Sequence, residues 1–173
     1  MEEKAVRAQI RGFLKKNNLC TSYPVNLSEI AEAVGAFIGF NFFPEKISGA
    51  VFRGTRDDYP YLIAVNINKH PHHRRFTIAH ELSHIILNHL KKCRYLMDCS
   101  DFYNWALMKR GIEREANIGA SEMLVPTDEL KRILSCNWSI IELARFFGVS
   151  KQVMEYRLIE VNGKNFQNSM LIL

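Results

Sequence analysis

The stretch His73–His89, HRRFTIAHELSHIILNH, decides the fold of this chain of 173 residues. Residues 80–84 within it, HELSH, form an HExxH motif. Residues four apart lie on the same face of an α-helix, so His80 and His84 can both turn a ring nitrogen toward one metal ion. Glu81 lies next to that face, where it can reach a water molecule without being a ligand. This arrangement is typical of zinc peptidases, in which two imidazoles bind Zn²⁺ and a carboxylate acts as general base.

The surrounding sequence favours the helix that this motif requires. Residues Phe76 to Lys92 are largely apolar and include no proline or glycine, and the two lysines at the end suit a helix C-terminus. Pro71, just upstream, fits a helix start. The alternative is a buried core helix whose two histidines only form hydrogen bonds. Each histidine would then need its own buried partner, whereas one metal ion serves both.

The third metal ligand is expected from a second helix. Catalytic zinc usually has three protein ligands and one open position. The HExxHxxGxxH pattern fails because Leu87 and Leu90 occupy the positions of its glycine and third histidine. His89, if the helix continued, would be rotated off the ligand face. A glutamate from residues 113–117, EREAN, is therefore the candidate.

Glu113 is the preferred ligand within that segment. Glu113 and Asn117 are four apart and share a helix face, so Asn117 could accept a hydrogen bond from the other ring nitrogen of a ligand histidine. Glu115 is the competing ligand, and it lies about 200° around the helix from Glu113. The remaining alternative makes both glutamates surface acids that pair with Arg110 or Arg114.

These motifs resemble those of the ImmA/IrrE family of metallopeptidases. The resemblance is carried by residues 75–84, 113–117 and 124–126, and it covers roughly Asn26 to Leu158. It implies a gluzincin-like core in which His80, His84 and Glu113 bind zinc and Glu81 is the base. Family members often cleave, or otherwise inactivate, a helix-turn-helix repressor of a phage, mobile element or stress regulon. The implied partner is therefore a protein substrate, a DNA-binding repressor.

The predicted fold class is α+β, a mostly helical zincin-like domain with a small, mainly antiparallel sheet of three strands. Helices are expected over residues 5–16 and from residue 26, before strands over residues 36–43, 50–53 and 61–66. We expect the third strand to be an edge strand that pairs with an extended substrate. Its substrate-binding residues would be Tyr61, Ile63 and Val65.

The second half of the chain is expected to be helical. Residues 93–105 lack a clear period and are expected to cover the cleft, and helices follow over residues 106–124 and 128–134. Residues 139–142 form a capping box that begins a C-terminal helix-turn-helix-like pair. We expect residues 1–134 to form the metallopeptidase core and residues 135–173 to form a region packed on it.

The helix pair does not have the charge expected of a DNA reader. A helix that reads DNA should be basic, but Lys151 and Arg157 are offset by Glu155 and Glu160. We therefore predict no DNA-binding residues and no direct contact with DNA. The pair would be structural or would bind the substrate repressor.

The composition is that of a soluble globular protein. Hydrophobic residues make up 47% and charged residues 24%, and the net charge of +5 permits acidic partners without requiring them. The four cysteines form no CxxC pair, and no signal peptide or membrane span is recognisable, so reduced thiols, a cytoplasmic location and no membrane contact are expected.

The sequence as a whole predicts a zinc-dependent endopeptidase. Glu81 would take a proton from the attacking water, and a second donor to the oxyanion is expected, with Tyr61, Tyr95, Tyr103 and residues 70–73 as candidates. Two alternatives remain open. One is a zinc-containing regulatory or antitoxin-like protein that does not cleave, and the other is a DNA-binding regulator that uses residues 139–158.

Overall fold

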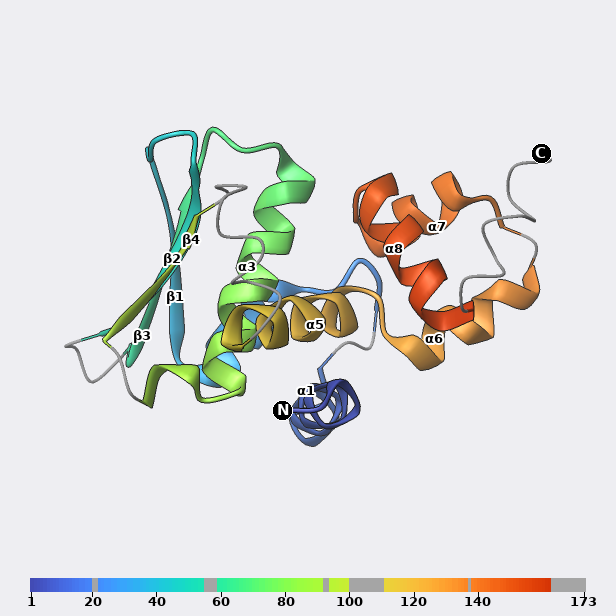
Figure 1. Cartoon of the computed structure of the whole chain (residues 1–173), viewed down its shortest axis with the longest axis horizontal. Helices are drawn as coiled ribbons and strands as arrows, with labels where there is room; N and C mark the ends of the chain where they lie inside the picture. Colours follow the sequence, from blue (N-terminus) through green and yellow to red (C-terminus); the bar gives the residue numbers. More distant parts are fainter. Residues whose placement is uncertain (20–21, 55–58, 92–93, 100–110, 137, 163–173) are drawn as a thin grey trace.

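The computed structural model describes residues 1–19, 22–54, 59–91, 94–99, 111–136 and 138–162 (Figure 1). Its helices are α1 (Glu3–Lys16), α2 (Leu27–Val34), α3 (Pro71–Ile86), α5 (Ile112–Leu124), α6 (Thr127–Ile133), α7 (Ile140–Phe147) and α8 (Lys151–Asn162). Its strands are β1 (Ala36–Asn41), β2 (Ile47–Arg53), β3 (Tyr61–Asn66) and β4 (Tyr95–Cys99). The sheet lies at one end, α3 and α5 in the middle and α6 to α8 at the other end. The α+β class is confirmed.

The sheet differs from the prediction in strand number and in direction. Four strands pair in the order β1-β3-β2-β4. β1 runs parallel to β3, whereas β2 is antiparallel to both β3 and β4. β4 comes from the segment expected to cover the cleft, of which Tyr103 and Trp105 lie outside the described residues. A parallel pair needs a crossover connection between strands, and local sequence patterns do not reveal that partner.

The prediction that residues 61–66 form an edge strand is wrong. β3 is paired on both sides, with β1 and with β2, so its backbone groups are already used in ladders. An added substrate strand needs a free edge. Ile63 and Val65 have no exposed surface and pack in the core, and Tyr61 is half-buried. Among the described strands, β1 and β4 form the edges.

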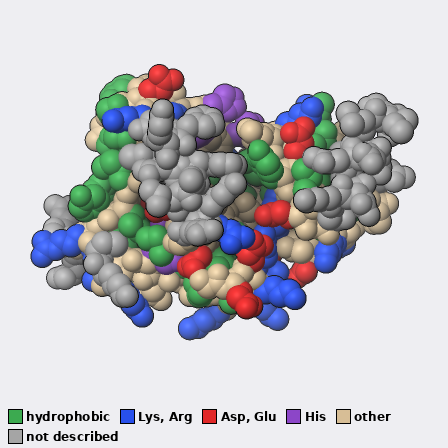
Figure 2. Space-filling view, in the orientation of Figure 1, with side chains coloured by type: hydrophobic (Ala, Val, Ile, Leu, Met, Phe, Trp, Pro, Cys, Tyr) green, Lys and Arg blue, Asp and Glu red, His purple; other side chains and the backbone are tan. Residues whose placement is uncertain are grey.

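The two faces of the sheet have different surroundings. One face packs against α3. On the other face a row of large apolar side chains crosses all four strands, because the register aligns Phe37 with Leu62, Leu62 with Phe52, and Phe52 with Tyr95. Phe37 is 50% exposed and Tyr95 is 58% exposed. Hydrophobic side chains are accordingly visible on the surface over the strands (Figure 2).

Small residues allow α3 to approach both the sheet and α5 closely. A Cβ atom on Gly49 of β2 would lie 2.5 Å from Cγ2 of Thr77 on α3. A Cβ atom on Gly119 of α5 would lie 2.7 Å from Oγ of Ser83. Ser83 is fully buried, and its hydroxyl donates a hydrogen bond to the Ala79 carbonyl at 2.7 Å. Real Cβ atoms do not come this near to other atoms, so α3 sits in contact with both neighbours.

The helix that carries the HExxH motif begins where expected and ends earlier. Pro71 occupies the first helical turn, and the His70 side chain accepts a hydrogen bond from the backbone N–H of His72. The expected continuation to Lys92 is wrong, because α3 ends at Ile86 and Asn88 has a positive φ of 60°. Asn tolerates the left-handed conformation better than most residues. The chain therefore turns there into the short 3-10 helix η1 (His89–Lys91).

The C-terminal helices are joined to α5 through buried charge. The predicted capping box at Ser139 and Glu142 is present at the start of α7. Arg157 of α8 is only 2% exposed and donates hydrogen bonds to Glu122 and to the Val125 carbonyl at the end of α5. No helix formed by the described residues is long and apolar enough to cross a membrane. The division at residue 134 stays a prediction.

Candidate metal centre

Helix α3 presents two imidazoles side by side in the interior. His80 is 2% exposed and His84 is 1% exposed. Their Nε2 atoms are 3.0 Å apart, as the spacing of four residues on one helix face requires. The apolar neighbours Ile78, Ala79, Leu82 and Ile85 hold this part of α3 in the core. Two polar rings buried this deeply need partners of their own.

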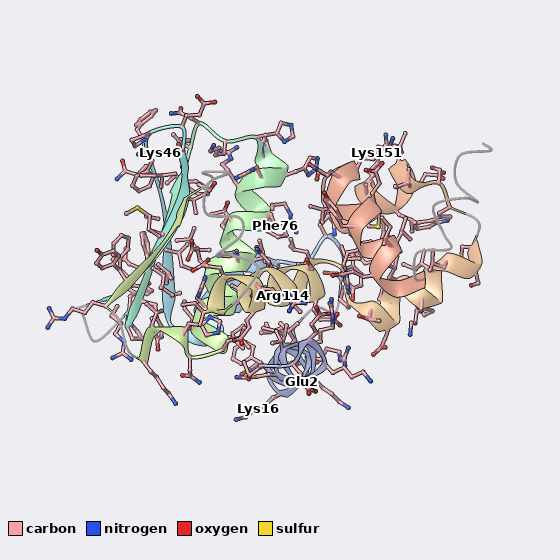
Figure 3. All side chains as sticks on the ribbon, in the orientation of Figure 1. Glu2, Lys16, Lys46, Phe76, Arg114 and Lys151 are labelled. Carbon is pink, nitrogen blue, oxygen red and sulfur yellow. The ribbon has the colours of Figure 1, made fainter. Side chains whose placement is uncertain are left out.

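A carboxylate from α5 completes a group of three. Oε2 of Glu113 lies 3.1 Å from Nε2 of His80 and 3.4 Å from Nε2 of His84. Glu113 stands in the first turn of α5, which packs against α3. Figure 3 labels Phe76 on α3 and Arg114 on α5. Among the described residues, His80, His84 and Glu113 form a group whose ligand atoms all lie within 4.8 Å of one another.

The spacing of these three atoms fits a tetrahedral zinc site. Bonds of about 2.0–2.1 Å at tetrahedral angles separate ligand atoms by about 3.3 Å. The observed separations are 3.0, 3.1 and 3.4 Å. Two nitrogens and one oxygen also match the His₂Glu ligand set of catalytic zinc sites. Such sites leave a fourth position of the metal for water or substrate. The residues therefore fit the metal.

Both metal-facing rings have a polar partner on their far side, and for His80 that partner selects the nitrogen that faces the centre. Nδ1 of His80 lies 2.9 Å from Oδ1 of Asn117, one turn after Glu113 on α5. Because an amide oxygen only accepts, Nδ1 of His80 carries the hydrogen and its Nε2 keeps a lone pair. Nδ1 of His84 lies 2.9 Å from Nδ1 of His89. With the Glu113 carboxylate, the centre therefore gathers lone pairs, which a cation satisfies.

Burial also favours the uncharged form of His84. Desolvation lowers the pKa of His84 to about 4, although the nearby Glu113 opposes this shift. The ring is thus neutral at pH 7 and able to donate a lone pair. Burial alone would raise the pKa of Glu113, but its contacts with His80 and His84 outweigh burial and hold that pKa well below the usual range. A neutral imidazole and an ionised carboxylate are the ligand forms that a metal needs.

Glu81 lies beside the centre and under the sheet. It follows His80 on α3, is 1% exposed, and both of its carboxylate oxygens are buried. A Cβ atom on Gly49 of β2 would lie 3.6 Å from Oε1 of Glu81. A glycine at this position thus lets β2 approach α3 closely beside this carboxylate. Its surroundings shield it from bulk water.

Sequence reasoning missed the contact between His89 and Glu115. Nε2 of His89 lies 3.0 Å from Oε2 of Glu115. Glu115 was considered as a rival ligand, and the structure instead places its carboxylate against His89. A continued α3 would rotate His89 away from the ligand face, but α3 ends before His89. The sequence offered one signal for this contact: His89 and Glu115 are polar residues near the ends of two helices that pack together.

Three of the described candidates for the second oxyanion donor, Tyr95, His72 and His73, contact or face other parts of the chain. Tyr95 lies on the face of the sheet that points away from α3, and Tyr103 lies outside the described residues. His72 contacts the Gly148 carbonyl at 3.2 Å, and His73 contacts Oγ of Ser48 at 2.9 Å. These two histidines therefore connect the first turn of α3 to neighbouring segments.

The two basic residues considered for DNA binding are both engaged in ion pairs. Arg157 is buried and contacts Glu122 at 2.9 Å. Lys151 lies 3.6 Å from Glu155 on the same helix. A buried arginine cannot reach a phosphate group, so Arg157 is not available for a contact with DNA.

Comparisons with known proteins point to one group of metallopeptidases. A family model described as the IrrE N-terminal-like domain, in a peptidase family, matches residues 39–159. The chain is similar to the radiation response metalloprotease IrrE of Deinococcus deserti, with 34% identity over 111 residues, and to that of Deinococcus radiodurans, with 32% identity over 111 residues. It is also similar to metallopeptidase ImmA of Bacillus subtilis, with 28% identity over 99 residues.

The alignments cover only part of each relative. They include 62% of this chain and 39% of the Deinococcus deserti protein, and 62% and 33% for the Deinococcus radiodurans protein. For ImmA they include 56% of each protein. The chain thus spans about a third to just over half of the length of these relatives. The family model matches the region that contains both α3 and α5, the helices of the candidate centre.

Proposed function

Because the chain belongs to the peptidase family described by the IrrE N-terminal-like domain, we propose that it is a zinc-dependent endopeptidase that cleaves a protein substrate. The observation that carries this proposal is the convergence of His80, His84 and Glu113 within 4.8 Å. Two buried imidazoles and one carboxylate form a ligand set of catalytic zinc.

The proposed roles follow from the positions of the side chains. His80, His84 and Glu113 hold the metal, and Asn117 orients His80 through its 2.9 Å contact with Nδ1. When bound, zinc supplies Lewis acidity for the attacking water and for the scissile carbonyl. Three protein ligands would leave a fourth position of the metal for water or substrate.

Glu81 is the proposed general base. A carboxylate next to His80 on α3 takes the proton of the attacking water and then returns it to the leaving amine, which turns the amine into a good leaving group. The burial of Glu81 supports this role, since a carboxylate shielded from bulk solvent is a better proton acceptor than a hydrated one.

We propose β4 as the strand that binds the substrate backbone. β4 is an edge of the described sheet and pairs with β2. β2 in turn lies over Glu81 through Gly49. An extended peptide that added to the free side of β4 would lie two strands from β2, about 10 Å away, since neighbouring strands are about 4.8 Å apart. Main-chain hydrogen bonds would supply much of the grip.

The proposed substrate class is a helix-turn-helix transcriptional repressor. This part of the proposal rests on the resemblance to the ImmA/IrrE family rather than on a contact in the structure. The test is incubation of the zinc-loaded protein with a panel of purified repressors, followed by mass spectrometry of the products. Defined fragments from one repressor support the proposal. A stable complex without fragments would instead indicate a regulator that binds without cleaving.

Substitution of Glu81 tests the mechanism separately. We expect Glu81→Gln to keep about one zinc per chain, because Glu81 is not a ligand, and to lower the cleavage rate by about 10²- to 10⁴-fold or more, the usual contribution of a general base. The measurements are elemental analysis and the initial rate on the same substrate. Cleavage at the rate of the unsubstituted protein would remove Glu81 from the base role.

A further inference from the structure

A buried chain of hydrogen bonds leads from His84 away from the candidate centre. Nδ1 of His84 lies 2.9 Å from Nδ1 of His89, and Nε2 of His89 lies 3.0 Å from Oε2 of Glu115. The His89 side chain is 5% exposed and that of Glu115 is 15% exposed. His84, His89 and Glu115 come from α3, η1 and α5, so these two contacts connect three elements around the ring of His84.

The Glu115 carboxylate, at the end of this chain of contacts, sets the direction of the hydrogen bonds. A carboxylate only accepts, so Nε2 of His89 carries the hydrogen in its contact with Glu115. A neutral His89 then has a lone pair on Nδ1. That lone pair accepts from Nδ1 of His84, which must carry a hydrogen in turn. The Nε2 atom of His84 is left with its lone pair directed at Glu113 and His80.

His80 and His84 thus both carry their hydrogen on Nδ1, but different groups accept the hydrogen bond from it. For His80 the acceptor is the side-chain oxygen of Asn117, at 2.9 Å. For His84 it is the imidazole of His89, whose own orientation depends on Glu115. Neutral imidazole has two forms that differ in which nitrogen carries the hydrogen, and only one of them leaves Nε2 free.

We propose that His89 and Glu115 are positioning residues that hold His84 in the form whose Nε2 lone pair faces the metal. The proposal rests on the proposed function, since it assigns these residues to the zinc site. The partners of ligand histidines typically change metal affinity about 10- to 100-fold when they are removed.

The backbone supports this role for His89. Asn88, with a φ of 60°, ends α3 and turns the chain so that His89 returns toward His84. The ring centroids of His84 and His89 are 5.0 Å apart, with an interplanar angle of 72°. Edge-on packing of this kind points a nitrogen of one ring at a nitrogen of the other. A continued helix would have carried His89 past this position.

The experiment compares substitutions that differ in whether they keep the acceptor. His89→Leu removes it, whereas His89→Asn keeps an oxygen at the place of Nδ1, one bond from Cγ. Glu115→Ala removes the group that orients His89. His72→Leu, a change at an exposed histidine of α3, serves as the control. Circular dichroism and the thermal midpoint establish that each variant is folded.

Two readouts are taken for every variant. Zinc affinity is measured by competition with a chromophoric chelator. The hydrogen position on His84 is measured in the metal-free protein from ¹⁵N chemical shifts of the imidazole nitrogens. We expect His89→Leu and Glu115→Ala to bind zinc about 10- to 100-fold more weakly, and His89→Leu to give a mixture of the two His84 forms. His89→Asn and His72→Leu should bind zinc within about threefold of the unsubstituted protein.

The outcomes separate this inference from the proposed function. Equal weakening by His89→Leu and His89→Asn would show that only the shape of His89 matters and would overturn the inference. Unchanged affinity and unchanged ¹⁵N shifts in His89→Leu would do the same. An unsubstituted protein that binds no zinc would contradict the proposed function, while the ¹⁵N shifts of His84 would still decide which nitrogen carries its hydrogen.

Discussion

Glu113 and Glu115 are two residues apart on α5 and contact different histidines. The carboxylate of Glu113 lies 3.1 Å from Nε2 of His80, on the side of the helix that faces α3. That of Glu115 lies 3.0 Å from Nε2 of His89. The angle of about 100° between successive helix residues explains why both cannot reach the same point. Glu113 is therefore in place to bind the metal directly, and Glu115 is in place to act on it through His89.

The metal content of two alanine variants tests this distinction. Glu113→Ala removes one of three ligands, so we expect it to lose most of its zinc after purification without chelator. Glu115→Ala keeps all three ligands and should hold about one zinc per chain when zinc is supplied in excess, despite a weaker affinity. Elemental analysis of both variants and of the unsubstituted protein provides the comparison. The reverse pattern would make Glu115 the ligand.

For single residues, sequence patterns predicted the contacts that depend on helix periodicity. The pairing of His80 with His84 and the place of Asn117 next to Glu113 both follow from a spacing of four residues. The contact of His89 with His84 could not be predicted in this way, because it depends on where α3 ends. That end is set by the left-handed conformation of Asn88, one of several residues at which a helix could stop.

The crossing of α3 and α5 determines how closely Glu113 approaches the two histidines. Ser83, between His80 and His84, faces Gly119 on α5. No larger side chain fits at this contact, since a Cβ atom on Gly119 would lie 2.7 Å from Oγ of Ser83 and 3.3 Å from Cδ1 of Ile10. The small size of Ser83 is thus compatible with close packing of the two helices.

Substitutions at this contact should be coupled. Gly119→Ala gains helix propensity but crowds Ser83, and overpacking in a core typically costs about 1–3 kcal/mol. In a Ser83→Gly background the crowding atoms are absent, so the same change should cost little or should stabilise. Urea unfolding of both single variants and the double variant gives the coupling, expected at about 1–2 kcal/mol. Additive effects would mean that the helices adjust their separation freely.

The order of elements was easier to predict than their pairing. Capping residues and apolar periods placed α1, α2, α7 and the start of α3 near their observed positions. The sheet was predicted less well, because strand pairing depends on contacts between segments distant in sequence. β4 was missed because it is only five residues long, and the parallel pairing of β1 with β3 has no local signature. Because strand pairing could not be predicted, residues 61–66 were expected to be an edge strand that binds substrate, whereas β3 is an inner strand of the sheet.

One buried carboxylate connects three distant parts of the molecule. Glu122, near the end of α5, has no exposed surface. It accepts hydrogen bonds from Arg7 of α1 at 3.0 Å, from Arg157 of α8 at 2.9 Å and from the hydroxyl of Thr127 at 2.6 Å. The N-terminal helix and the last described helix therefore meet on the same side chain. The helix that carries Glu113 and Asn117 is fixed at its far end by this network.

The network makes the stability of the whole chain sensitive to acid. Burial alone would raise the pKa of Glu122, but the hydrogen bond from Thr127 and the charge of Arg157 outweigh burial and lower it below its ordinary value of 4.5. A carboxyl group with a lowered pKa in the folded state stabilises that state above its unfolded pKa. This contribution is lost as the pH falls below about 4.5 and through the folded pKa.

Substitution of Glu122 by glutamine tests this linkage. Glu122→Gln keeps the shape of the side chain but leaves Arg157 buried with the partly exposed Glu160 as its one ionic partner among the described residues. Removing one member of a buried ion pair typically costs about 3–5 kcal/mol, and we expect the lower end of that range at pH 7 because Glu160 remains. Glu129→Gln, a change in an ion pair near the surface with Arg132, is the control and should have little effect.

The free energy of unfolding is measured in urea at pH 7 and at several values below pH 4.5. The difference between the unsubstituted protein and Glu122→Gln should shrink as the pH falls, because protonation removes the same charge that the substitution removes. A difference that stayed constant over this range would show that Glu122 stabilises the fold through its shape and its hydrogen bonds, independently of its charge.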